Sequence, residues 1–145
     1  YRVNPRWLTL EVTESAVMDD PDTGLETLQH LASMGLNLAI DDYGTGYSSM
    51  SYLKKLPVRE IKIDKSFVMN LKANDDDEIL VRSTIDLGHN LGLKVTAEGV
   101  EDLESYRKLK QHGCDMAQGY FIARPISAHD VEQTVSEEYL KALIA

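Results

Sequence analysis

The sequence predicts an α/β fold built on a parallel sheet, and two patterns support this prediction. First, short apolar runs rich in strand-forming residues alternate with helical segments along the 145 residues. Such alternation is typical of parallel strands joined by right-handed crossovers. Second, Leu36–Ile40 is almost entirely apolar, as expected for a strand covered on both faces.

Two architectures fit this order of elements: an open doubly wound sheet and part of an eight-stranded barrel. Doubly wound nucleotide-binding folds usually carry a glycine fingerprint after their first strand, and this sequence has none there. A complete barrel needs about 250 residues, so this chain would supply only its last five β/α units. Both architectures remain open from the pattern alone.

The first β/α units are marked by strand and helix signals. Residues 8–13 alternate apolar and polar side chains, as in a half-buried strand. A helix then begins at Pro21 and ends at Gly35, because proline and glycine mark these two ends of helices. Its inner face is expected to carry Leu25, Leu28, Leu31 and Met34. A short helix over Ser48–Leu56 is stopped by Pro57.

The remaining units follow in the same alternation. The predicted strands are Glu60–Asp64, Lys94–Ala97 and Met116–Tyr120. The predicted helices are Asp77–Leu91, Leu103–Gln111 and a last helix over about Ala128–Leu143. We therefore expect five parallel strands within one domain that spans residues 1–145.

Composition narrows the class of protein. An apolar share of 43% and a charged share of 27% indicate a soluble globular domain. No apolar run approaches the roughly 20 residues of a membrane span, and Cys114 is the only cysteine. We therefore expect a cytoplasmic chain whose parent protein is free to be membrane-anchored elsewhere. The net charge of −9 argues against binding to DNA or RNA polymers.

Polar residues recur at or near the carboxyl ends of the predicted strands. They are Glu11, Asp41, Asp42, Lys62, Glu98 and Gln118. The carboxyl ends of parallel strands form the site in α/β folds. Carboxylates that converge there need cations, and hard oxygen ligands select Mg²⁺, Mn²⁺ or Ca²⁺. We expect a two-metal site suited to attack on a phosphodiester, with Lys62 beside the water or the developing charge.

Each of these residues also has a simpler interpretation. Adjacent acids before glycine, as at Asp41–Asp42, are common in turns. Glu11 fits an exposed strand face, and Lys62 fits an ordinary surface lysine. Glu98 with Glu101 fits an acid pair at a helix N-terminus. The joint pattern favours the metal site, because successive strands seldom end this way by chance.

Longer motifs give these residues a family context. Leu10–Ser15 reads Leu-Glu-Val-Thr-Glu-Ser, Asp41–Ser49 reads Asp-Asp-Tyr-Gly-Thr-Gly-Tyr-Ser-Ser, and Thr96–Glu101 reads Thr-Ala-Glu-Gly-Val-Glu. With Leu56–Phe67 and Gln118–Pro125, they resemble the EAL family of bacterial cyclic di-GMP phosphodiesterases, which fold as a modified TIM barrel. Tyr43 stands where phenylalanine is commoner in that family.

The resemblance implies roles for individual residues. The implied metal ligands are Glu11, Asp41, Asp42 and Glu98, with Mg²⁺ or Mn²⁺ as the cofactor and Asp41 as the bridge. Lys62 and Gln118 would act with Glu98 in catalysis. Lys62 would contact the attacking water or the phosphate, and Gln118 would line the metal-water shell.

The resemblance also implies a mobile loop, a partner surface and a nucleotide pocket. Glu14 and Glu101 would hold the loop that follows Asp42. That loop would link the metal site to a homo-oligomer interface, and it consists of Tyr43, Gly44, Thr45, Gly46, Tyr47, Ser48 and Ser49. Arg124 and Pro125 would line the guanine pocket of cyclic di-GMP.

The chain departs from the family pattern in one large respect. The Glu-Ala-Leu stretch that gives the family its name, and an asparagine ligand, would precede Glu11, so these 145 residues represent the C-terminal part of an EAL domain. Three functions are compatible with this. The parent domain hydrolyses cyclic di-GMP to the linear dinucleotide while this chain alone is inactive. Alternatively, the chain binds nucleotide or protein without turnover, or it is a fragment that folds only by oligomerising.

Overall fold

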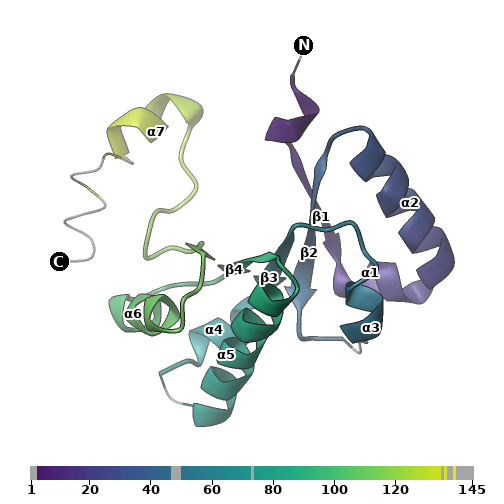
Figure 1. Ribbon diagram of the computed structural model, residues 1–145. Helices are drawn as coiled ribbons and strands as arrows, with labels where there is room; N and C mark the ends of the chain where they lie inside the picture. Colours follow the sequence, from purple (N-terminus) through teal and green to yellow (C-terminus); the bar gives the residue numbers. More distant parts are fainter. Residues whose placement is uncertain (1–2, 47–49, 73, 135, 137–138, 140–145) are drawn as a thin grey trace.

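The computed structural model describes residues 3–46, 50–72, 74–134, 136 and 139 of the chain (Figure 1). Its strands are β1 (Thr9–Thr13), β2 (Asn37–Tyr43), β3 (Glu60–Ile63), β4 (Lys94–Ala97) and β5 (Met116–Ala117). Its α-helices are α1 (Glu14–Asp19), α2 (Pro21–Ser33), α3 (Met50–Leu53), α4 (Lys65–Met69), α5 (Asp75–Asn90), α6 (Leu103–Gln111) and α7 (Ala128–Thr134). A 3-10 turn, η1 (Pro5–Trp7), precedes β1.

The strands form one parallel sheet in the order β1-β2-β3-β4-β5. Each strand therefore pairs with the next one along the chain, and all carboxyl ends lie at the same edge. The α/β class and the parallel strand pairing predicted from the sequence are confirmed. No helix in the described part of the chain is long and apolar enough to cross a membrane.

Helices α2 and α5 pack against the sheet, and two groups of buried side chains lie between the helices and the strands. Leu38 and Ile40 of β2 pack with Leu28 of α2 in one group. Val95 of β4 packs with Ile85 of α5 in the other. These contacts hold the strands beside one another and thereby fix the positions of the polar side chains at the strand ends.

The carboxyl end of β2 differs from the prediction. The strand continues through both aspartates to Tyr43, so Asp41 and Asp42 lie within it and not in a turn. Asp42 has a positive φ of 53°, and the register between β2 and β3 shifts between Ile40 and Tyr43. This irregularity turns two successive carboxylates toward one side, which an ideal strand with alternating side chains cannot do.

Other boundaries also differ from those predicted. β5 is only two residues long, so Gln118 follows the strand. Helix α1 was not predicted; Thr13 caps it by accepting a hydrogen bond from the Ala16 N–H. Met34 is exposed and not on the inner face of α2, because it lies at the C-cap beyond the last helical turn. The predicted last helix corresponds to α7 over Ala128–Thr134. Most of residues 135–143, the rest of that prediction, lie outside the described part of the chain.

A group of polar contacts around Asp115 holds the amino end of β4. One carboxylate oxygen of Asp115 accepts hydrogen bonds from the Val95 N–H and the His89 ring, each at 2.9 Å. The other accepts from the Lys94 ammonium at 2.7 Å. Burial alone would raise the pKa of Asp115, but these donors outweigh burial and lower the pKa to about 2.

We predict that this carboxylate makes the fold sensitive to acid. Because the pKa of Asp115 is lower in the folded state than in the unfolded state, its contribution to stability is present above pH 4 and is lost as the pH falls toward 2. Asp115→Asn should lower the free energy of unfolding by about 1 to 2 kcal/mol at pH 7, as measured by urea denaturation. The difference from the unsubstituted chain should shrink near pH 2.5. A difference that is constant with pH would contradict this account.

Candidate metal centre

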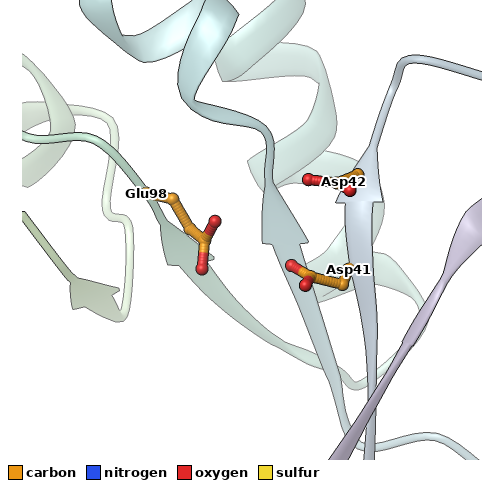
Figure 2. A group of neighbouring side chains, drawn as sticks. All are labelled: Asp41, Asp42 and Glu98. Carbon is orange, nitrogen blue, oxygen red and sulfur yellow. The ribbon is translucent and has the colours of Figure 1, made fainter.

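Three carboxylates converge at the carboxyl edge of the sheet. Asp41 and Asp42 come from the end of β2, and Glu98 directly follows β4. Each offers one oxygen, and these oxygens all lie within 4.8 Å of one another. Figure 2 shows that the side chains of Asp41 and Glu98 extend toward each other from strands on either side of β3. The spacing allows the three side chains to share one cation.

Lys62 lies on β3 between these strands and supplies the positive charge of the site. Its side chain is buried. The ammonium nitrogen lies 2.7 Å from Glu11 Oε2 and 2.6 Å from Glu98 Oε1. It lies 3.4 Å from Asp41 Oδ1. The interpretation of Lys62 as a surface lysine is therefore wrong.

The carboxylates keep Lys62 charged. Burial would lower the pKa of Lys62, but its hydrogen bonds to Glu11 and Glu98 outweigh burial and raise the pKa above its ordinary value. A single ammonium cannot neutralise Glu11, Asp41, Asp42 and Glu98 together. The site therefore retains excess negative charge even with Lys62 in place.

The excess negative charge affects both Asp42 and Asp41. Burial raises the pKa of Asp42, and the neighbouring carboxylates Asp41 and Asp64 raise it further. Asp41 Oδ1 is buried and accepts no hydrogen bond within the described residues, although Lys62 lies nearby. A buried oxygen without a donor is costly. Carboxylate oxygens in this state suit a hard divalent cation such as Mg²⁺ or Mn²⁺.

Glu14 fixes the loop that follows β2. It is buried, with 2% of its surface exposed, at the start of α1. Its Oε2 accepts hydrogen bonds from the backbone N–H groups of Gly44 at 3.0 Å and Gly46 at 3.2 Å. Gly44 has a φ of 101°, which favours glycine. The predicted loop residues Tyr47, Ser48 and Ser49 lie outside the described part of the chain.

The other predicted site residues lie around the carboxylates. Gln118 lines a hollow of about 480 Å³ with Glu11 and Lys62. Glu101 is exposed and lines a second hollow of about 510 Å³ with Glu98 and Gln118. Within the described residues, no hydrogen bond or ion pair joins Glu101 to the loop after Asp42.

The segment that contains Arg124 and Pro125 lies on the same side of the molecule. The guanidinium carbon of Arg124 lies 4.5 Å from the centre of the Tyr120 ring. Such a cation–π contact presents a flat, positively charged surface. Tyr120 also lines the hollow that contains Glu98 and Gln118. The structure thus brings the ring of Tyr120, with the Arg124 guanidinium over it, to the edge of the site.

Two polar residues near the site were not identified from the sequence. Glu60 of β3 lines the same hollow as Lys62 and accepts a hydrogen bond from the Thr96 hydroxyl at 2.6 Å. Asp64 caps α4 by accepting from the Ser66 N–H at 2.9 Å, and it lies beside Asp42. Glu60 could have been found from its spacing to Lys62, since residues two apart on a strand share a face. An aspartate directly before α4 was an N-cap signal for Asp64.

The chain is similar to known proteins over most of its length. The EAL domain profile matches residues 1–125. MucR of Pseudomonas aeruginosa, a bifunctional diguanylate cyclase/cyclic di-GMP phosphodiesterase, is 43% identical over 136 residues. These cover 94% of this chain and 20% of MucR. The chain spans between 15% and 21% of the length of the curated relatives it matches.

Solved structures match the fold. The MucR phosphodiesterase in complex with c-di-GMP has a TM-score of 0.86 and 44% identity, covering 89% of this chain and 52% of that one. BlrP1 of Klebsiella pneumoniae, in complex with manganese and cyclic di-GMP, has a TM-score of 0.79 and 35% identity. That match covers 85% of this chain and 31% of BlrP1. The five-stranded sheet therefore corresponds to part of the EAL TIM-barrel fold, and the open doubly wound alternative is excluded.

We predict that Lys62 contributes to stability as well as to the site. Lys62→Met should lower the free energy of unfolding at pH 7 by about 1 to 3 kcal/mol, because it leaves the partly buried carboxylates of Asp41 and Glu98 without their cationic partner. Lys72→Met is a matched control, since Lys72 pairs with Asp102 at the surface, and it should cost less than about 1 kcal/mol. Urea denaturation followed by circular dichroism measures both. Equal, small losses for the two variants would show that the Lys62 network is not stabilising.

Proposed function

Because this chain belongs to the EAL domain family, we propose that it carries part of a divalent-cation site for the hydrolysis of cyclic di-GMP to the linear dinucleotide. Residues 1–145 would then be the C-terminal part of one EAL domain, and that whole domain would be the catalytic unit. The observation that carries the proposal is the cluster of Asp41, Asp42 and Glu98 with Lys62 buried beside it.

The ligands of the cation would be Glu11, Asp41, Asp42 and Glu98. Asp41 is the best candidate for a bridging ligand, because its Oδ1 is buried and accepts no hydrogen bond from the described residues, although the Lys62 ammonium lies 3.4 Å away. When bound, Mg²⁺ or Mn²⁺ supplies positive charge to the phosphodiester and helps water to lose a proton. The excess negative charge around Asp42 supports this assignment.

Lys62 would act on the negative charge that develops during hydrolysis. Its ammonium is held by Glu11 and Glu98 and remains protonated at neutral pH. It can therefore orient a water molecule and stabilise a phosphate oxygen, but it cannot serve as a general base. Gln118 would orient water from the facing side of the hollow, where its backbone is fixed by the hydrogen bond from its N–H to Ala97 O at 2.9 Å.

The loop after β2 and the segment around Arg124 would extend the site. Glu14 holds Gly44 and Gly46, so a movement of α1 would reach the end of β2. We propose that the loop from Tyr43 to Ser49 couples the carboxylates to a second copy of the chain, with Glu101 as a further anchor. The Arg124–Tyr120 contact, with Pro125, would form one side of a pocket for a guanine base.

A second candidate function is binding without turnover. The chain covers about half of the solved MucR chain, and its 145 residues contain no Glu-Ala-Leu tripeptide. If the glutamate of that motif and the asparagine ligand are both needed, these residues alone would bind nucleotide or a protein partner and would not hydrolyse it.

We predict that Mn²⁺ binds at the carboxylate cluster. Glu98→Gln should weaken the binding at least about tenfold, since even outer-shell changes at metal sites cost that much. Glu104→Gln provides the control, because Glu104 lies on α6 in the first helical turn, away from the cluster. Electron paramagnetic resonance of free Mn²⁺ measures the binding of each protein. The same affinity for both variants would rule out the cluster as the binding site.

We predict negligible hydrolysis of cyclic di-GMP by the 145-residue chain with either Mg²⁺ or Mn²⁺, because two expected ligands lie outside these residues. Chromatography of the nucleotide after incubation detects the linear product. Robust turnover that disappears in Glu98→Ala would show that the residues present are sufficient for catalysis.

A further inference from the structure

A hollow lined by two arginines lies at the opposite edge of the sheet from the carboxylates. It measures about 690 Å³, and its lining includes Arg6, Gly35, Asn37, Pro57 and Arg59. Asn37 begins β2, Arg59 directly precedes β3, and Arg6 lies in η1 before β1. Figure 1 shows η1 and the turn between α2 and β2 at the same end of the sheet. The hollow is therefore formed by the amino ends of β1, β2 and β3.

The backbones of these residues are fixed, while their charges are not neutralised. The Asn37 side chain donates to the Arg6 carbonyl at 2.8 Å, and the Arg59 N–H donates to the Leu38 carbonyl at 2.9 Å. Neither guanidinium forms an ion pair with any described residue, and the lining contains no Asp or Glu. In a chain whose net charge is −9, these two exposed guanidinium groups thus place uncompensated positive charge at a single hollow.

We propose that this hollow binds the phosphate group of a small phosphorylated ligand. A guanidinium group presents a planar set of donors that matches phosphate oxygens in pairs. A phosphate monoester carries a charge of about −1.5 to −2 at pH 7, and two arginines neutralise this charge. A ligand with a single carboxylate carries too little negative charge to neutralise both arginines. The volume falls within the range of about 300 to 1,000 Å³ that is usual for ligand pockets.

This site is independent of the proposed metal centre. The two lie at opposite ends of the same strands, and no lining residue of the arginine hollow belongs to the carboxylate cluster. A ligand bound here would contact the chain where β2 and β3 begin, and the metal site lies where β2 ends. The proposed phosphate site can therefore be tested independently of the proposed phosphodiesterase activity.

A titration with inorganic phosphate tests the proposal. The 145-residue chain, labelled with ¹⁵N, is titrated in buffer that contains a metal chelator, so that phosphate cannot bind through a cation. We expect saturable shifts of the Gly35 and Asn37 amide signals, weakened by added salt. Arg6→Gln and Arg59→Gln should each weaken binding by about tenfold or more, because each removes charge-assisted hydrogen bonds. Arg59→Lys should retain part of the affinity.

Controls separate this result from general charge effects. Arg107→Gln removes an exposed arginine on α6 and should leave phosphate binding unchanged. Circular dichroism verifies that each variant keeps the fold. Absence of saturable shifts at Gly35 and Asn37, or equal binding by the Arg59→Gln and Arg107→Gln variants, would overturn the proposal. An affinity for acetate equal to that for phosphate would also overturn the assignment of phosphate.

Discussion

The buried ammonium of Lys62 contacts oxygens of Glu11, Asp41 and Glu98, and the arrangement of the site depends on this interaction. These carboxylates come from β1, β2 and the end of β4, so a single side chain on β3 joins four neighbouring strands. Without it, the like charges at the carboxyl edge of the sheet would repel one another with no cation between them. Because one ammonium is too little charge for four carboxylates, the same arrangement favours an additional cation.

The geometry of the parallel sheet makes this convergence possible. Strands that pair in sequence order bring all their carboxyl ends to one edge, and the buried contacts of α2 and α5 hold the strands in place. The irregular end of β2 then turns two successive aspartates toward the same space. Glu14 anchors the chain immediately beyond them. The sheet thus holds the strands that carry the site, and Glu14 of α1 holds the loop that follows β2.

Much of this arrangement could be predicted from the sequence, because apolar runs set the strands and parallel pairing sets where they end. The predicted strand stopped at Ile40, where the apolar run ends. β2 instead continues through Asp41 and Asp42 to Tyr43, which pairs with Ile63 of β3, a residue distant in sequence. The strand predicted over Met116–Tyr120 was too long, since β5 ends at Ala117. The prediction carried the strand on through Gln118 and Gly119 because apolar residues precede them. Glu60 was missed because its partner, Thr96, is distant in sequence.

We propose that Asp41, Asp42 and Glu98 hold a divalent cation beside Lys62. Crystals of the chain grown with Mn²⁺, with data collected at a wavelength where manganese scatters anomalously, test it most directly. The account predicts an anomalous peak at about 2.0 to 2.3 Å from oxygens of these three side chains, the distance usual for hard cations and carboxylates. A fully occupied manganese site elsewhere, for instance among Asp75, Asp76 and Asp77, with none at the cluster, would contradict it.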